Sequence, residues 1–315
     1  MLLAAVAVRW LAQPRDRAAP ARVARLALRR PVRAVVVAPH PDDEVLGAGG
    51  LVARLVRRRQ PVDVVFLTSG DGYLEAAGLA AETCPQDAWA LRELAVVRQG
   101  EARTAATRLG LDPAHLHFLG FPDGDLPALW STHWRQPLVS PRTGAAAPYT
   151  PGVVDPGATY TGRALVGLLA AVLATLQPTL VLVPDPRDTH DDHEHAAFFA
   201  LRAIGSLPAP PRVLTYLVHD DCWPPTADET RRLPPPSAER LADTRWLELR
   251  LTPAERAAKV AALDAHRTQL AAMPELLYRF LRPNELFGEV EPDALAALVP
   301  RPGTAPPPRR GAPCS

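Results

Sequence analysis

The stretch 33–44, Arg-Ala-Val-Val-Val-Ala-Pro-His-Pro-Asp-Asp-Glu, decides the fold that this sequence predicts. After the leading arginine its first half is apolar, which is typical of a strand buried on both faces of a parallel sheet. A histidine and three acids follow almost at once. Functional side chains of α/β proteins gather where such strands end. The stretch therefore predicts a central strand and a polar site at its carboxyl end.

A second polar cluster, 190–193 (His-Asp-Asp-His), follows another buried-strand pattern at 179–183 (Thr-Leu-Val-Leu-Val). Zinc in a catalytic site takes three protein ligands and leaves one position open for water. His40, Asp43 and His193 are ligands of the right types. Because both clusters follow strands, they predict one shared metal site.

A hydrolytic site needs two further groups. One is a carboxylate that does not bind the metal and can take the proton of the attacking water, and Asp42 is the nearest candidate. The other is a donor that faces the developing oxyanion, a role that suits His190. His190 is also a candidate for the third ligand in place of His193. Asp192 has the position of a carboxylate that orients a histidine ring.

Taken alone, the His-x-x-Asp spacing of His40 and Asp43 is more typical of a surface histidine and a helix-capping acid. Asp42 would then be a second capping acid. The two motifs together favour the metal site. Asp123, in a Pro-Asp-Gly sequence, is interpreted as an ordinary turn residue.

These motifs resemble the family of zinc-dependent deacetylases that includes the N-acetylglucosaminyl-phosphatidylinositol de-N-acetylases (PIG-L) and the bacterial LmbE-like proteins. Its signature is an Ala-His-Pro-Asp-Asp-Glu strand end plus a later His-Pro-Asp-His. Here Pro39 replaces the alanine of the first motif, and Asp191 replaces the proline of the later motif. The resemblance implies zinc binding by His40, Asp43 and His193, proton transfer by Asp42, and oxyanion stabilisation by His190.

Further similarity lies in the segments 67–72, 98–101, 118–124 and 259–269, so the resemblance covers most of residues 33–290. It implies that Arg98 binds substrate hydroxyls. The alternative for Arg98 is an ion pair with Glu101, three residues later on a helix. Lys259, His266 and Gln269 are interpreted as solvent-facing or structural residues.

Strand and helix patterns alternate along the chain, which predicts a three-layer α/β/α sandwich with a mainly parallel, Rossmann-like sheet. The expected strands are 33–38, 62–68, 116–119, 180–183 and 213–218. The expected helices are 44–58, 92–109, 162–176, 195–204 and 254–273. Residues 125–156 are expected to form a long loop that shapes the pocket mouth.

Three segments are expected. Residues 1–31 form an extension that fits a surface helix or a loose lead-in, 32–292 the deacetylase domain, and 293–315 a disordered tail rich in Pro and Arg. A net charge of +1 gives no footprint for nucleic acid. A membrane span is not expected, because no apolar run reaches about 20 residues. The expected location is cytoplasmic, with an N-terminal signal or anchor in 1–12 left open. The oligomeric state is unassigned.

The predicted reaction removes an N-acetyl group from a small molecule, an N-acetylglucosamine-type amino sugar or its conjugate. Zn²⁺ is the expected cofactor, although Fe²⁺ suits these ligands almost equally. One alternative is a zinc amidase that acts on a larger N-acyl or S-conjugate amide. Another is a carbohydrate-binding protein with a structural zinc. The free carboxylate of Asp42 argues against the last, because a structural zinc site is closed and needs no base.

Overall fold

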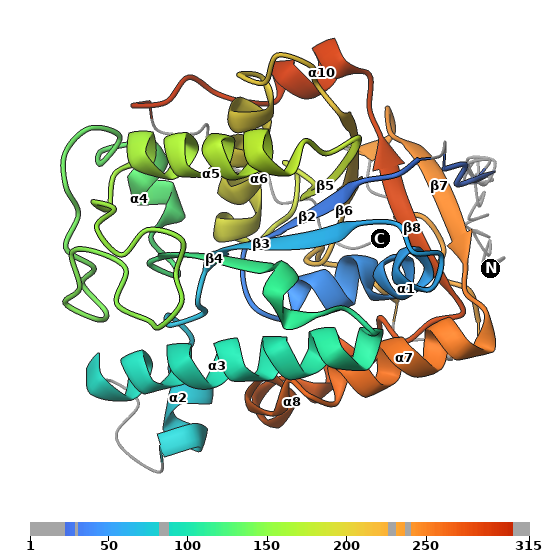
Figure 1. Ribbon diagram of the computed structural model, residues 1–315, viewed down its shortest axis with the longest axis horizontal. Helices are drawn as coiled ribbons and strands as arrows, with labels where there is room; N and C mark the ends of the chain where they lie inside the picture. Colours follow the sequence, from blue (N-terminus) through green and yellow to red (C-terminus); the bar gives the residue numbers. More distant parts are fainter. Residues whose placement is uncertain (1–22, 29–30, 82–87, 226–230, 237–240, 305–315) are drawn as a thin grey trace, which may run out of the picture.

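The computed structural model describes residues 23–28, 31–81, 88–225, 231–236 and 241–304. These residues form one sheet of eight strands between two layers of helices (Figure 1). The strand order is β1-β7-β8-β6-β5-β2-β3-β4. The strands are β1 (Ala24–Arg25), β2 (Ala34–Ala38), β3 (Val62–Thr68), β4 (Leu116–Phe121), β5 (Leu180–Pro184), β6 (Arg212–Tyr216), β7 (Arg245–Arg250) and β8 (Asn284–Glu289).

Five neighbouring strands, β4, β3, β2, β5 and β6, are parallel, whereas β8 runs antiparallel between β6 and β7. The predicted α/β sandwich with a mainly parallel sheet is confirmed. The chain passes from β2 to β3 and β4 on one side, and later fills the other side with β5 and β6. The boundary between β2 and β5 is therefore the topological switch point, where open α/β sheets bind their ligands.

The two helical layers bury both faces of the sheet. On one face lie α1 (Asp43–Arg57), α3 (Ala88–Leu109) and α7 (Pro253–Leu263), and on the other α4 (Leu126–Trp130), α5 (Gly162–Leu176) and α6 (Asp191–Ile204) (Figure 1). Alternate side chains of β2 serve the two layers: Val36 packs towards α1, and Val35 and Val37 towards α5 and α6. The short helices are α2 (Leu74–Ala81), η1 (Pro113–His115), α8 (Arg267–Ala272), α9 (Pro274–Tyr278) and α10 (Pro292–Ala297).

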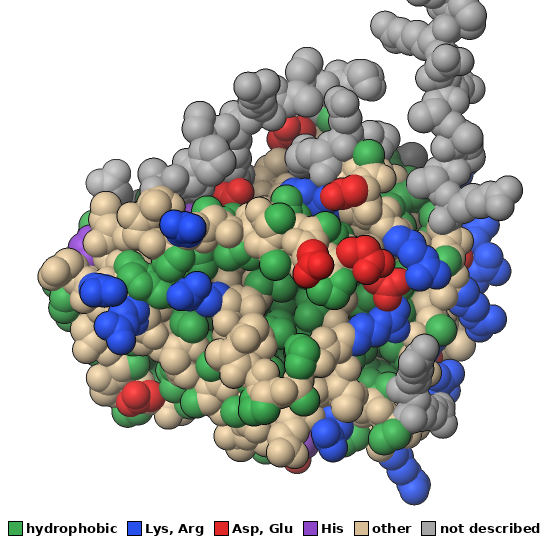
Figure 2. Space-filling model, turned by 90° about the horizontal axis from the view of Figure 1, so that it is seen from above, with side chains coloured by type: hydrophobic (Ala, Val, Ile, Leu, Met, Phe, Trp, Pro, Cys, Tyr) green, Lys and Arg blue, Asp and Glu red, His purple; other side chains and the backbone are tan. Residues whose placement is uncertain are grey.

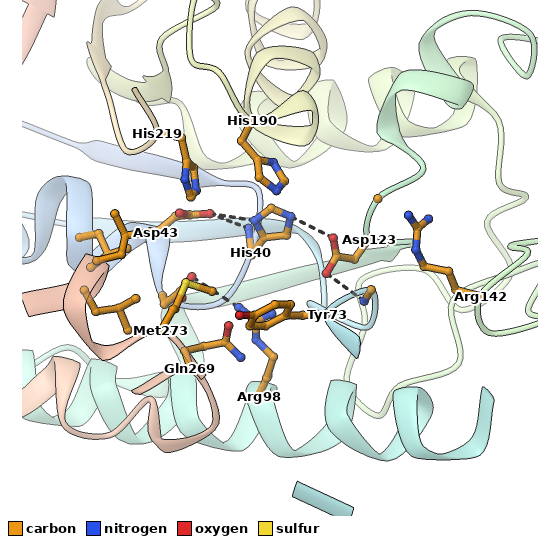
Figure 3. A pocket seen from close by; sticks show the side chains of 16 residues that line it. His40, Asp43, Tyr73, Arg98, Asp123, Arg142, His190, His219, Gln269 and Met273 are labelled. Carbon is orange, nitrogen blue, oxygen red and sulfur yellow. Dashed lines mark hydrogen bonds and ion pairs between the residues drawn. The ribbon is translucent and has the colours of Figure 1, made fainter. Parts of the chain in front are cut away.

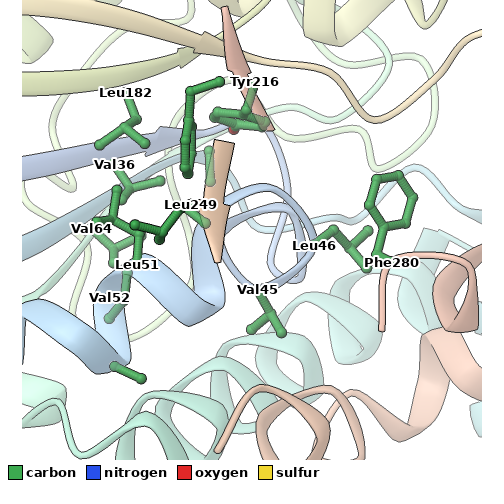
Figure 4. Close-up of a cluster of buried hydrophobic side chains, with 14 of the residues drawn as sticks. Val36, Val45, Leu46, Leu51, Val52, Val64, Leu182, Tyr216, Leu249 and Phe280 are labelled. Atoms are coloured by element: carbon green, nitrogen blue, oxygen red, sulfur yellow. The ribbon is translucent and has the colours of Figure 1, made fainter. Parts of the chain in front are cut away.

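Helix α1 approaches the sheet closely because Gly47 has no side chain. A Cβ atom there would lie 2.4 Å from Cδ2 of Tyr216. Figure 4 shows Tyr216 in the apolar cluster that also contains Val36 and Leu51. The Tyr216 hydroxyl donates to the carbonyl of Val37 at 2.7 Å. These contacts fix α1 against β2 and β6, and so fix the position of its first turn.

The expected helix 254–273 is two helices, α7 and α8, because the chain turns at residues 264–266. This turn carries His266 into the interior, where its side chain is fully buried. Lys259 and Gln269 are also buried, so of the two interpretations of these residues the solvent-facing one is wrong, and the structural one agrees with their burial. Strands β7 and β8 were not expected from the sequence, and α6 begins at Asp191, four residues earlier than expected.

The chain stays packed beyond residue 292, the expected end of the domain. Leu295 of α10 is buried, and the N–H of Gly303 donates to the carbonyl of Trp130 at 2.8 Å. The expected disorder therefore does not begin at residue 293, and residues 305–315 lie outside the described part. Of the expected extension 1–31, the described residues 23–28 contain β1, which pairs with β7.

The face seen from above α5 and α10 mixes apolar side chains with arginine and acidic side chains (Figure 2). Among the described residues, no helix has the length and apolar character needed to cross a membrane.

Candidate metal centre and active site

A pocket of about 310 Å³ opens at the switch point, between the segments that follow β2 and β5 (Figure 3). The turn 39–42 leads from β2 into α1, and the loop 185–190 leads from β5 into α6. His40, Asp42, Asp43 and His190 line this pocket. The structure thus brings together the two motifs that are far apart in the sequence.

Three ligand atoms converge beside the pocket. Oδ2 of Asp43 lies 3.2 Å from Nδ1 of His40 and 3.3 Å from Nε2 of His193. All three residues are buried, and their ligand atoms lie within 4.8 Å of one another. Tetrahedral zinc with ligands at about 2.0 Å holds them about 3.3 Å apart. The spacing therefore fits a zinc-sized ion.

The surroundings of His193 also fit a cation. The ring is fully buried, and neither ring nitrogen completes a hydrogen bond within the described part of the chain. Nδ1 faces Oδ2 of Asp188 at 3.3 Å, which leaves Nε2 for the point shared with His40 and Asp43. Although burial disfavours the charged ring, Asp43 and Asp188 raise the pKa of His193 to about 10. Without a metal this acidic environment holds a proton on the ring.

Two carboxylates face the far side of the His40 ring. Nε2 lies 3.1 Å from Oδ1 of Asp123 and 3.3 Å from Oδ2 of Asp192. Asp192 accepts the N–H of Gly124 at 2.6 Å, and Asp123 accepts the N–H of Gly72 at 2.9 Å. His40 is therefore oriented with Nδ1 towards Asp43 and His193. Asp192 contacts a histidine ring, which is compatible with the orienting role expected of it, and Asp123 also contacts the site, although its motif favoured an ordinary turn.

Asp42 is next to Asp43 in the chain and lines the same pocket, but it does not belong to the cluster of candidate ligands formed by His40, Asp43 and His193. Its backbone has φ 139°, a conformation that residues other than glycine seldom adopt. Burial raises the pKa of its carboxyl group to about 7, against the opposing effect of Arg98. A carboxyl group of this pKa can both accept and return a proton near neutral pH.

Arg98 is buried and holds the turn that carries Asp42. Its guanidinium donates to the carbonyls of Gly70 and Pro41 at 3.1 and 2.8 Å, and lies 3.5 Å from Oδ1 of Asp42. The alternative ion pair with Glu101 is not formed in the described residues, because the Glu101 carboxylate accepts from the N–H and hydroxyl of Thr268. Arg98 also lines the pocket.

His190 is the N-cap of α6. Its Nδ1 accepts the N–H of Asp192 at 3.2 Å, so the neutral ring carries its proton on Nε2. Burial, reinforced by His193 and His40, lowers the pKa of His190 to about 3. A neutral imidazole with an N–H beside the pocket can donate a hydrogen bond to a developing negative charge without first gaining a proton.

His219 and Asp188 belong to the site but were not identified from the sequence. The ring of His219 lies 4.6 Å from that of His193 and 4.9 Å from that of His190, and it lines the pocket. Both residues lie outside the two motifs. His219 meets the motifs only because β6 pairs with β5, which no local pattern shows. Asp188 lies in the loop between β5 and α6, two residues before His190. A histidine closely following a strand pattern at 213–218 was the one available signal.

The rest of the pocket has two kinds of wall. Tyr73 and Arg142 lie on the side of Asp123 (Figure 3), and Arg142 comes from the long loop that was expected to shape the mouth. The other side is mainly apolar and is lined by Leu46, Met273, Leu276 and Leu277.

The chain belongs to the GlcNAc-PI de-N-acetylase (PIG-L) family, whose model matches residues 35–204. A 1D-myo-inositol 2-acetamido-2-deoxy-alpha-D-glucopyranoside deacetylase of Mycobacterium sp. (strain KMS) is 33% identical over 167 residues, 52% of this chain. The match covers 46% of that relative, so the chain spans about half its length. A protein of the same name from Saccharomonospora viridis is 30% identical over 254 residues, 75% of this chain and 84% of that one.

Two solved structures share the fold. Teicoplanin deacetylase Orf2 in its zinc-inhibited form has a TM-score of 0.53 at 18% identity, covering 81% of this chain and 97% of that one. N,N'-diacetylchitobiose deacetylase from Pyrococcus horikoshii has a TM-score of 0.52 at 17% identity, covering 84% and 85%.

Proposed function

We propose that this protein is a metal-dependent hydrolase that removes the acetyl group from an N-acetylglucosamine-type amino sugar or its conjugate. The observation that carries the proposal is the position of Asp42. Its buried carboxyl group lies beside three convergent ligand atoms and is not itself one of the candidate metal ligands. Family membership and the names of the relatives, which are sugar deacetylases, support the substrate class. The products would be acetate and a free amine.

His40, Asp43 and His193 would hold the metal ion. Zinc bound there would supply a Lewis acid for the acyl carbonyl and a water of lowered pKa. Zinc is favoured over iron(II) only by the resemblance, because both metals suit two histidines and one carboxylate.

The chain's own groups would move the proton and hold the developing charge. Asp42 would take the proton of the attacking water and return it to the leaving nitrogen, which its raised pKa favours. His190 would donate from Nε2 to the oxyanion of the tetrahedral intermediate, because its Nδ1 is already occupied. Arg98 would hold Asp42 from behind and contact the substrate at the pocket wall.

The apolar wall favours a second candidate substrate, an amide with an acyl group larger than acetyl. Leu46 and Leu277 are buried, and Met273 and Leu276 lie beside them at the pocket. A linear acyl chain would bury apolar surface there, at about 0.8 kcal/mol per methylene group.

The test measures amine release by the zinc-loaded protein from N-acetylated amino sugars, their inositol and disaccharide conjugates, and N-acyl analogues of increasing chain length. Asp42→Asn, which keeps the size of the side chain and removes its basicity, is the control. We expect release by the parent, a loss of about 10²-fold to 10⁴-fold in kcat in the variant, and one zinc per chain in both.

The outcome separates the candidates. Faster release with longer acyl chains would favour the wider amidase. A zinc-loaded parent that binds sugars and releases no amine, with unchanged binding by Asp42→Asn, would contradict hydrolysis and favour a carbohydrate-binding protein.

A further inference from the structure

We infer that Glu44 and His266 are positioning residues for Asp42, and that they hold the proposed base in its working orientation through contacts separate from those of Arg98. The inference rests on the proposed function, because it assigns a role relative to the base. Glu44 and His266 are both buried. Neither belongs to the candidate metal cluster, and neither lines the pocket.

The backbone conformation at Asp42 must be stabilised by neighbouring groups. Its φ of 139° is unusual for a residue with a side chain, and its side chain makes no capping hydrogen bond to α1. Such conformations persist only where the surroundings over-determine them. The position of the Asp42 carboxylate, relative to the fixed ligand Asp43 next to it, therefore depends on what holds its backbone.

Glu44 holds this backbone from the first turn of α1. Its Oε2 accepts the backbone N–H of Asp42 at 2.9 Å. Glu44 is buried, so this charge-assisted bond is shielded from water. The bond fixes the peptide plane before Asp42 and with it the direction in which the carboxyl group leaves the backbone.

His266 fixes Glu44 from another element. Nε2 of His266 lies 3.4 Å from Oε1 of Glu44, the oxygen that Asp42 does not use. The ring is fully buried, and neither of its nitrogens completes a hydrogen bond in the described part of the chain. Buried polar groups are normally paired, and the Glu44 carboxylate is the one acidic group within 4 Å of the His266 ring among the described residues.

The turn that carries His266 is itself fastened to the helix of Arg98. Both oxygens of Glu101 on α3 accept from Thr268, two residues after His266, at 2.9 and 2.7 Å. Helix α3 thus holds Asp42 directly through Arg98 and indirectly through Thr268, His266 and Glu44.

The test compares His266→Asn with His266→Gln in the zinc-loaded protein. Asparagine places its amide near the Nδ1 position and cannot reach Glu44, whereas glutamine places an N–H near Nε2. Loss of groups that orient catalytic residues costs about ten-fold to hundred-fold in activity. We expect such a fall in kcat for His266→Asn with KM and zinc content unchanged, and recovery of most of it in His266→Gln.

His195→Asn is the matched control for burial. His195 is also buried, and its Nδ1 contacts the carbonyl of Asp191 at 2.7 Å, a contact that asparagine can keep. We expect kcat close to that of the parent. A merely structural role for His266 would instead lower kcat in proportion to lost zinc or to unfolded protein, and glutamine would not rescue it.

A crystal structure of zinc-loaded His266→Asn gives a readout without turnover. The inference requires the Asp42 carboxylate to move in this variant while Asp43 stays in place. An unmoved Asp42 carboxylate would overturn the inference. A kcat of His266→Asn equal to that of the parent would also overturn it. Failure of the proposed function is distinct, because the parent itself would then release no amine. The crystallographic comparison would still decide the role of His266.

Discussion

Oδ2 of Asp188 faces Nδ1 of His193 at 3.3 Å and also accepts the backbone N–H groups of Val218 and His219 at 3.1 and 3.0 Å. These bonds fix the carboxylate to the segment that follows β6. Burial raises the pKa of Asp188, but the groups around it, the His193 ring first among them, together have a larger opposite effect. The resulting pKa is about 2, so the carboxyl group remains ionised. Asp188 therefore directs Nε2 of His193 towards Asp43 and increases the basicity of the ring.

Asp188→Asn should weaken zinc binding about ten-fold to hundred-fold, because carboxylates that orient metal-binding histidines typically contribute this much. The dissociation constant can be measured by competition with a chelating dye. Asp191→Asn is the control, since Asp191 is an exposed acid at the start of the same region. Equal affinity in the parent and Asp188→Asn would show that backbone packing alone orients His193.

His190→Ala should retain one zinc per chain and lose about 10²-fold to 10³-fold in kcat, which is the usual effect of removing one oxyanion donor. The N-cap bond to Asp192 would also be lost, so the unfolding temperature of each variant must be recorded. His193→Ala, by contrast, should lose the metal. Zinc loss in His190→Ala would identify His190 as a ligand and contradict the assignment.

Lys259→Met should destabilise the fold by about 3–5 kcal/mol, because it leaves one partner of a buried ion pair without its counter-charge. Nζ of Lys259 lies 2.8 Å from Oε1 of Glu285 and 2.8 Å from the carbonyl of Leu46. Urea unfolding of the parent, both single variants and the double variant Lys259→Met with Glu285→Gln measures the coupling. Additive losses would show that the pair does not interact.

Gly47→Ala should destabilise the protein by about 1–3 kcal/mol, because the added methyl group would collide with the ring of Tyr216. Gly100→Ala is the matched control. Gly100 lies in the interior of α3, and a Cβ atom there would meet nothing within 4 Å. That substitution should stabilise the protein by about 0.5–1 kcal/mol through helix propensity. We expect the unfolding temperature to fall for Gly47→Ala and to rise for Gly100→Ala. Equal decreases in the two variants would contradict the steric explanation.

The central part of the fold could be predicted because its local patterns are strong. Strand β3 has the expected bounds, since its apolar run lies between Pro61 and Ser69. Helix α5 also has the expected bounds, with Thr161 as its N-cap. Buried parallel strands need continuous apolar runs, and such runs are visible in one sequence.

Strand β8 could not be predicted, because its first two residues are polar and buried. Asn284 exchanges two hydrogen bonds with the backbone of Leu233, and Glu285 accepts from the N–H groups of Gly50 and Leu51. Their partners are far away in the sequence. The same reason applies to the site: the motif residues were readable, whereas the contacts of Asp123 and His266 depend on tertiary structure.

The burial of Lys259 has a practical consequence for detecting turnover. It is the only lysine in the sequence, and its ammonium group is enclosed between α1, α7 and β8. An amine-reactive fluorogenic dye added to the intact protein would therefore meet no accessible lysine side chain. Apart from an α-amino group, which adds at most one equivalent per chain, the protein would contribute little signal. Release of a sugar amine can therefore be followed at a higher enzyme concentration than for a lysine-rich protein, which helps with a slow substrate.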